Sequence, residues 1–139
     1  MFLVRLIYAS RKDEKFNQTD IEDILSVART ENAKDGVTGL LCFNRKYFLQ
    51  CLEGSRSKVN ATYRKILNDP RHSDIVLLSY DEISVREFDN WHMGYIPETA
   101  LTDEVNLRYS GNKNFTPFEM TGESCHQMMR ELVDTVPLV

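Results

Sequence analysis

The first segment of the chain, residues 2–9, is a short run in which both faces of a strand would be largely apolar. Alternate positions are hydrophobic or aromatic on one face (Phe2, Val4, Leu6, Tyr8) and aliphatic or small on the other (Leu3, Ile7, Ala9). Because successive side chains of a strand point to opposite faces, such a strand needs cover on both. The sequence therefore predicts a central strand, in a sheet with elements packed against both faces.

After this strand, the spacing of apolar residues alternates between segments typical of helices and segments typical of strands. One helix is predicted to begin at a capping box formed by Thr19 and Glu22, and a second covers residues 57–68, before the helix-stopping Pro70. Their apolar stripes are Ile21, Ile24, Leu25 and Ala28 in the first helix, and Val59, Tyr63, Ile66 and Leu67 in the second. Further strands are predicted at residues 37–43, 47–52, 75–78 and 91–96, with a hairpin between the first two of these.

The resulting order, βαββαββ, predicts an α+β fold of the ferredoxin-like type with a mixed five-stranded sheet. Both helices are expected on one face, and strands one and three are expected to be adjacent, parallel and central. The last part of the chain then covers the other face. Thr121 can cap a helix with an apolar stripe formed by Cys125, Met128, Met129, Leu132, Val133 and Val136. We interpret this stripe as core rather than as a methionine-rich binding surface, and we expect a domain at residues 2–97 with a helical extension at 98–139.

Composition excludes several classes of function. The 139 residues allow one domain and leave no room for a separate enzyme domain, and 21 acidic against 17 basic residues argue against a nucleic-acid partner. Three cysteines without close pairing predict no disulfide framework, and three scattered histidines predict no metal site. No apolar stretch is long enough to span a membrane and no leader is evident, so we expect a soluble, cytoplasmic protein.

Two polar side chains interrupt strands that are otherwise apolar. Gln50 shares its face with Phe48 and Leu52, and Tyr8 is expected at the end of the first strand. A buried amide needs hydrogen-bond partners, and neighbouring strands would let Tyr8 and Gln50 bond on the helix-covered face. The pair is then either a satisfied core contact or a contact to a polar ligand between the two helices.

Two further positions leave the same choice open. Asn32, at the end of the first helix, can be a C-terminal cap or a ligand contact. Asp69 with Pro70 is sufficient as a helix stop, while Arg71 and His72 could also hold a phosphate.

Together these residues resemble the BLUF family, which comprises blue-light sensors that use flavin. The resemblance rests on Tyr8, on Asn32 in Glu31–Gly39, on Gln50 in Phe48–Gly54, on Asp69–His72 and on Trp91–Met93. It covers about residues 2–97. The region from Leu107 to Met120 more weakly resembles the short, stand-alone members of the cyanobacterial type.

The resemblance implies a flavin between the two helices, with FAD as the first choice and FMN as the alternative. It assigns cofactor-binding positions to Ile24, Asn32, Phe48, Gln50, Lys65, Ile66, Asp69, Arg71 and His72. Ile24 and Ile66 match the side chains that sandwich the ring. Asn32 matches the side chain that bonds its edge, and Asp69, Arg71 and His72 match positions near its ribityl or phosphate end. Glu31 stands where many relatives carry a neutral or basic polar residue, and we expect it to point to solvent. Lys65 stands where some relatives carry Arg.

The resemblance also implies the photochemistry. Tyr8 and Gln50 match the photoactive pair, in which light-driven electron and proton transfer from the tyrosine leaves the glutamine rotated or tautomerised. Trp91 and Met93 match positions that relay this change. The expected protein is a photoreceptor rather than an enzyme. Its output would pass to a separate protein partner, with a response regulator as one candidate, and it would form homo-oligomers. A flavin-dependent redox enzyme on the same scaffold is the alternative.

Overall fold

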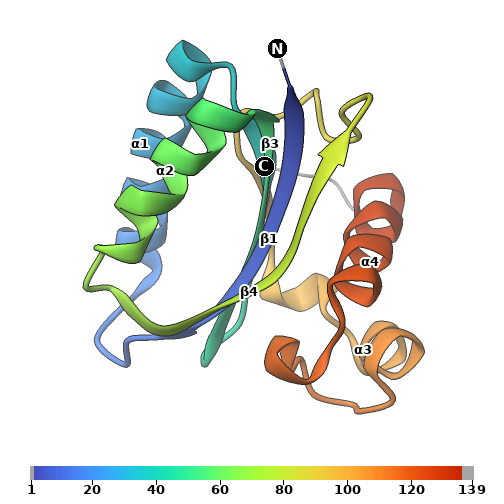
Figure 1. Cartoon of the computed structure of the whole chain (residues 1–139). Helices are drawn as coiled ribbons and strands as arrows, with labels where there is room; N and C mark the ends of the chain where they lie inside the picture. The colour runs from blue at the N-terminus through green and yellow to red at the C-terminus, as the bar shows by residue number, and fades with distance from the viewer. Residues whose placement is uncertain (1, 136–139) are drawn as a thin grey trace.

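A computed structural model describes residues 2–135 and contains one five-stranded sheet between two layers of helices (Figure 1). Its strands, in the spatial order β4-β1-β3-β2-β5, are β1 (Leu3–Lys12), β2 (Thr38–Phe43), β3 (Tyr47–Ser55), β4 (His72–Ile83) and β5 (Gly94–Ile96). The helices are α1 (Gln18–Asp35), α2 (Arg56–Leu67), α3 (Asp103–Ser110) and α4 (Gly122–Thr135), with short 3-10 turns at Glu98–Ala100 and Pro117–Glu119. The predicted α+β fold, with its mixed sheet, is confirmed.

One detail of the predicted topology is wrong. β1 and β3 are adjacent and central, but they pair antiparallel, and the parallel pair among the described strands is β2 with β5. The reason is connectivity. β2 follows β1 through the crossover helix α1 and runs in the same direction, whereas β3 returns through a hairpin and inserts between them. β3 therefore runs against both neighbours.

Several predicted boundaries also shift. α1 begins two residues earlier than expected, because the capping box is formed by Asn17 and Asp20. Tyr8 lies well inside β1 rather than at its end, β4 is much longer than residues 75–78, and β5 is only three residues long. Leu67 is 47% exposed, so it is not part of the buried stripe of α2.

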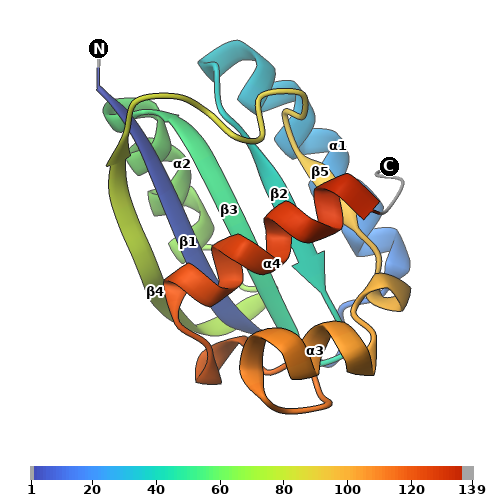
Figure 2. The ribbon, with the colours of Figure 1, turned by 90° about the vertical axis from the view of Figure 1, so that its right-hand side faces the viewer.

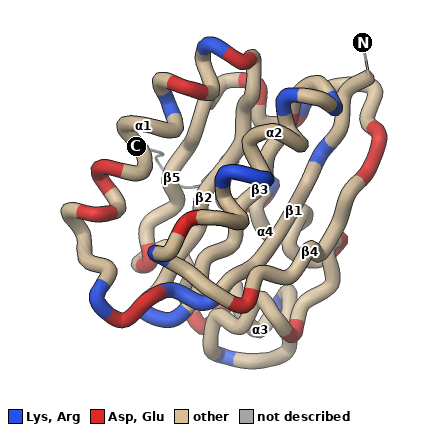
Figure 3. Tube along the Cα trace, turned by 60° about the vertical axis from the view of Figure 1, so that its left-hand side comes forward, with Lys and Arg blue, Asp and Glu red and all other residues tan. Residues whose placement is uncertain are grey.

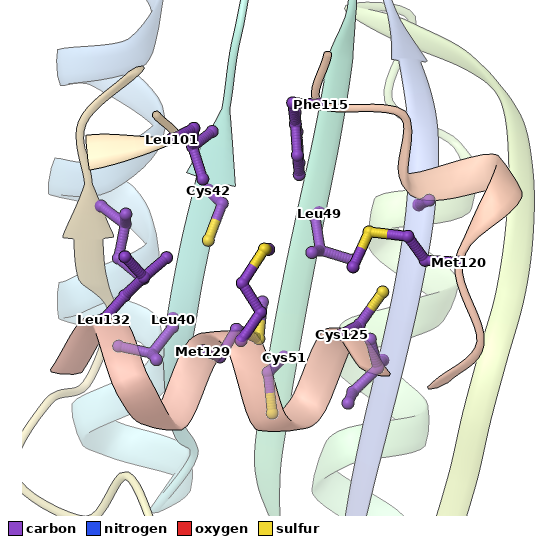
Figure 4. Close-up of a cluster of buried hydrophobic side chains, with 14 of the residues drawn as sticks. Leu40, Cys42, Leu49, Cys51, Leu101, Phe115, Met120, Cys125, Met129 and Leu132 are labelled. Carbon is purple, nitrogen blue, oxygen red and sulfur yellow. The ribbon is translucent and has the colours of Figure 1, made fainter. Parts of the chain in front are cut away.

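The sheet separates two hydrophobic cores, as the first strand predicted. The α1/α2 core contains Leu6, Tyr8, Ile21, Leu25 and Leu52 among its buried members. On the other face, α4 crosses in front of β1, β3 and β2 (Figure 2). Together they enclose the α4 core, which includes the buried residues Ile7, Cys42, Leu49, Cys51, Cys125, Met128, Met129 and Leu132 (Figure 4).

The α4 stripe is thus core, as interpreted. Val133 packs at its margin, and Val136 lies outside the described residues. The side chains of Met128 and Met129 are fully buried, and each contributes about 1.5–3 kcal/mol of hydrophobic stabilisation. All three cysteines are free and buried.

Lys/Arg and Asp/Glu positions are interspersed along α1 rather than separated by sign (Figure 3). Within residues 2–135, none of the helices is both long and apolar enough to cross a membrane.

A carboxylate buried on the α4 face of the sheet holds the connection between β4 and β5. The Glu53 side chain is inaccessible to solvent and accepts hydrogen bonds from Arg5 Nε (2.9 Å) and from the backbone amides of Glu87 (3.1 Å) and Phe88 (2.8 Å). A buried charge is tolerated only where such partners compensate its lost hydration. We call this arrangement the Glu53 clamp.

Substitution Glu53→Gln should therefore be severely destabilising, because it removes the closer and fully buried of the two carboxylates that pair with the buried Arg5 guanidinium, Glu53 and Glu87. We expect a loss of about 3–5 kcal/mol in the free energy of unfolding. Glu82→Gln is the matched control, since Glu82 pairs with Arg56 on the surface and should change stability by less than about 1 kcal/mol. Urea unfolding followed by circular dichroism measures both, and equal effects of the two substitutions would contradict the role of the clamp.

Candidate functional site

A cavity of about 270 Å³ lies between α1 and α2. Its volume is near the lower end of the usual range for small-molecule pockets, about 300–1,000 Å³. The cavity brings together Tyr8 and all nine predicted cofactor-binding residues: Ile24, Asn32, Phe48, Gln50, Lys65, Ile66, Asp69, Arg71 and His72. Trp91 and Met93 are not among the residues that line it.

Tyr8 and Gln50 meet beneath the cavity because they are directly paired across β1 and β3. Both side chains are buried, and the Tyr8 hydroxyl donates a hydrogen bond to Gln50 Oε1. Burial, together with Tyr63 and Asp69 nearby, raises the pKa of Tyr8 far above its usual value, so the phenol is neutral. The predicted contact on the helix-covered face is therefore present, and it includes an oxidisable phenol that still carries its proton.

The other end of the Gln50 amide contacts Met93. Gln50 Nε2 lies 3.4 Å from Met93 Sδ, and the Met93 side chain is buried. A thioether is a weak acceptor, so this amide end is held less firmly than the end that faces Tyr8. Because an amide carries a donor at one end and an acceptor at the other, its rotation would exchange the group presented to each neighbour.

Trp91 and Met93 lie on opposite sides of the sheet. Met93 belongs to the α1/α2 core, whereas Trp91 is half-buried against the α4 core. The backbone carbonyl of Trp91 accepts a hydrogen bond from the amide of Gly39 (3.0 Å), which joins this segment to β2. Of the two residues, Met93 is therefore the one next to the cavity in this structure.

Asn32 is not the C-terminal cap of α1, as one interpretation expected. That position belongs to Gly36, whose φ of 68° is left-handed and suits glycine. The Asn32 side chain is buried and its Nδ2 donates to the carbonyl oxygen of His92 (2.6 Å). Asn32 therefore joins α1 to the segment that precedes β5 while it lines the cavity.

The mouth of the cavity is polar. The Arg71 guanidinium donates hydrogen bonds to the Asp69 carboxylate from Nε (2.9 Å) and Nη2 (2.7 Å). These bonds lower the pKa of Asp69. Lys65 and Glu31 lie at the rim and are exposed, so the expectation that Glu31 faces solvent is confirmed. This part of the site can hold the polar or anionic tail of a ligand.

His72 fixes the wall beside the mouth. Its Nε2 lies 2.7 Å from the carbonyl oxygen of Ile66, and its Nδ1 lies 2.7 Å from the hydroxyl of the buried Ser10. A carbonyl can only accept, so Nε2 carries a proton in this arrangement. His72 thereby ties the last turn of α2, which carries Ile66, to β1.

The cavity also includes residues that the sequence interpretation did not identify. Leu41 forms part of its lining and pairs with Gln50 across β2 and β3, and Ala28 lies one helical turn after Ile24. The hairpin register and the helical period could have identified both. Thr62 lies one helical turn before Ile66 on α2, so the helical period could have identified it as well.

The residues present suit a flavin. Ile24 and Ile66 bring apolar side chains from the two facing helices, Phe48 adds an aromatic ring, and Asn32 and Gln50 add amides able to bond a heteroaromatic edge. The polar mouth suits a ribityl or phosphate group. The structure contains a slot that is apolar on its sides and polar at its inner edge and mouth, as a flavin requires.

Comparisons with known proteins agree. A family model described as sensors of blue-light using FAD matches residues 3–94. The chain is 43% identical over 121 residues to the blue light- and temperature-regulated antirepressor BluF of Escherichia coli (strain K12), a match that covers 86% of this chain and 30% of the relative. It is 34% identical over 93 residues to the photoactivated adenylate cyclase subunit alpha of Euglena gracilis, covering 66% of this chain and 9% of that protein. The chain thus spans less than a third of either curated relative.

Solved structures match over almost the whole chain. The photo-activated state of BlsA superposes with a TM-score of 0.88 at 31% identity, covering 99% of this chain and 98% of BlsA. The dark state of BlrB, a BLUF protein, superposes with a TM-score of 0.78 at 28% identity and 95% coverage of both chains. The motifs, the shared fold and the family match lead to one conclusion: this chain belongs to the BLUF family of flavin-based blue-light sensors.

Proposed function

We propose that the cavity between α1 and α2 holds the flavin of a blue-light photoreceptor and that Tyr8 and Gln50 are its photoactive pair. The observation that carries this proposal is the chain of contacts from the Tyr8 hydroxyl through the Gln50 amide to Met93 Sδ, beside a cavity suited to flavin. FAD is the expected cofactor, with FMN as the alternative.

Each residue has a specific task in this proposal. A bound flavin supplies the absorption of blue light and accepts an electron. Tyr8 gives up the electron and its hydroxyl proton, which burial keeps on the phenol until then. Gln50 Oε1 accepts the hydrogen bond along which that proton would pass toward the flavin. Once the electron and the proton have returned to Tyr8, the Gln50 amide is left rotated or tautomerised. Met93 senses the change because it contacts Gln50 Nε2.

The remaining residues hold the cofactor. Ile24 and Ile66 sandwich the ring with Phe48 nearby, and Asn32 bonds its edge. Lys65, Asp69, Arg71 and His72 surround the ribityl or phosphate end. In this division of the chain, residues 2–97 form the flavin-binding domain and residues 98–139 form an extension that carries the output.

The output is proposed to be contact with a separate protein rather than catalysis. The name of the antirepressor BluF supports such a partner, and a response regulator is one candidate. The comparisons give no support to a flavin-dependent redox enzyme, although some relatives are cyclase subunits. We propose that the protein acts in the cytoplasm, as a homo-oligomer that is independent of membranes and nucleic acid.

The absorption spectrum before and after blue light tests the photoactive pair. The protein with its flavin should show a reversible shift of the flavin bands, and Tyr8→Phe or Gln50→Leu should abolish it while flavin stays bound. Tyr63→Phe is the matched control, because the Tyr63 ring lies 5.7 Å from the Tyr8 ring and its loss should leave the shift intact. A normal shift in Tyr8→Phe would overturn the assignment.

Flavin affinity tests the cavity. Ile66→Ala removes three carbon atoms from its wall, and we expect a loss of roughly 2 kcal/mol, or about 30-fold in Kd for FAD. The neighbouring, exposed Leu67 is the control, and Leu67→Ala should change Kd by less than about threefold. Quenching of flavin fluorescence measures both. Equal effects would place the flavin elsewhere.

Light scattering tests the proposed assembly. The purified protein should have a mass above that of the 16.2 kDa chain, and blue light should change that mass. A monomer in both dark and light would contradict homo-oligomerisation. Oxidation of NADH by the purified protein, measured in the same samples, would instead favour the redox alternative.

A further inference from the structure

The connection between β4 and β5, residues 84–93, touches the cavity at one end and α4 at the other. We call it the connecting loop. At its C-terminal end, His92 O accepts a hydrogen bond from Asn32 Nδ2 (2.6 Å) and Met93 Sδ contacts Gln50 Nε2 (3.4 Å). Two residues that line the cavity therefore hold this end of the loop.

The other end of the loop is held by two carboxylates of different character. Glu53 is fully buried, and its oxygens bond Arg5 and the amides of Glu87 and Phe88 at 2.8–3.1 Å, so it acts as a rigid attachment. The Glu87 side chain is 30% exposed and faces groups of β1 and α4. Glu87 is thus the more exposed of the two.

The contacts of Glu87 join three elements. Its carboxylate lies 3.3 Å from Arg5 Nη2 on β1, 2.9 Å from Arg130 Nε on α4 and 3.1 Å from His126 Nε2, also on α4. The adjacent Phe88 is buried in the α4 core, with its ring 6.2 Å from that of His126. The position of α4 therefore depends on where the connecting loop holds Glu87.

The contact with His126 is not optimal in this arrangement. His126 Nε2 is buried, and despite its closeness to Glu87 it has no aligned hydrogen bond. Buried polar atoms are normally satisfied, so a small shift of Glu87 or α4 could gain a bond. Coupling between distant sites requires an element that can adopt two arrangements, and this contact is where a second arrangement would gain a hydrogen bond.

We propose that Glu87 is the positioning residue through which the connecting loop transmits the state of Gln50 to α4. This inference rests on the proposed function of Gln50. When the amide leaves Met93 Sδ, the C-terminal end of the loop loses one attachment, while the Glu53 clamp keeps its N-terminal end in place. The loop then shifts between these ends, and Glu87 alters its contacts with Arg130 and His126. The result is a change in how tightly α4 covers the sheet.

The chain contains its own reporter for this movement. Cys125 lies on the buried face of α4, inaccessible to solvent, and burial raises its pKa to about 12 (Figure 4). Such a thiol reacts only when α4 moves away from the sheet. Labelling of Cys125 by N-ethylmaleimide, followed by mass spectrometry of the Cys125 peptide in dark and light, therefore measures the position of α4.

The test compares Glu87→Gln with Glu131→Gln, both in the flavin-loaded protein. Glu131 also pairs α4 with another element, bonding Arg108 of α3, and its side chain is similarly exposed at 26%, but it does not contact the connecting loop. In the unaltered protein we expect blue light to change the labelling rate about fivefold or more, in line with ordinary coupling energies. Glu131→Gln should keep this ratio. Glu87→Gln should reduce it to about one while leaving the light-induced absorption shift unchanged.

Arg130→Gln provides a second variant that leaves Glu87 in place. It should lower the light-to-dark ratio by removing one of the contacts of Glu87 on α4. The inference would be overturned if Glu87→Gln kept the light-to-dark ratio of Cys125 labelling found in the unaltered protein. It would also be overturned if the unaltered protein showed a normal absorption shift but the same Cys125 labelling rate in dark and light. If the unaltered protein showed no absorption shift, the proposed function would fail, and this inference with it.

Discussion

A single strand register places both of the important polar pairs in this protein. β1 and β3 pair antiparallel so that Tyr8 lies opposite Gln50 and Arg5 lies opposite Glu53. Because the pairs are three residues apart along each strand, they fall on opposite faces of the sheet. Tyr8 and Gln50 face the cavity, while Arg5 and Glu53 face α4. A slip of one residue would turn every side chain of the strand to the wrong face, so the site and the clamp depend on the same pairing.

The two pairs are satisfied to different degrees, and this difference suits their proposed tasks. Glu53 has a guanidinium and two backbone amides as partners, so any movement would expose an uncompensated charge. Gln50 bonds the Tyr8 hydroxyl firmly at one end and only a thioether at the other. Its amide can change orientation at much lower cost. The same sheet thus contains a rigid attachment and a mobile one, and the connecting loop contacts both.

Cover on both faces gives the sheet two cores with separate tasks. α1 and α2 enclose the cavity, whereas α4 closes a core rich in sulfur side chains. Trp91 and Met93 show the separation most clearly, because they are two residues apart and yet pack into different cores. The described contacts between Gln50 and Met93, and between Glu87 and α4, connect the cavity with the opposite face of the sheet.

Periodicity in the sequence alone determined the fold class and the two-sided cover of β1, because burial patterns are local properties. The resemblance to the BLUF family identified most of the residues that line the cavity, but not Leu41, Ala28 or Thr62. The direction of β3 relative to β1 was predicted wrongly as parallel, since it depends on how the crossover and the hairpin combine. Nor could the sequence assign Asn32 to His92 or Trp91 to the α4 core, because segments far apart in the chain create those contacts. The partners of Glu87 likewise come from β1 and α4. Only the tertiary structure brings Glu87 and these partners together. Charged side chains interact strongly only when they lie within a few ångströms in space, and distance along the chain does not determine this.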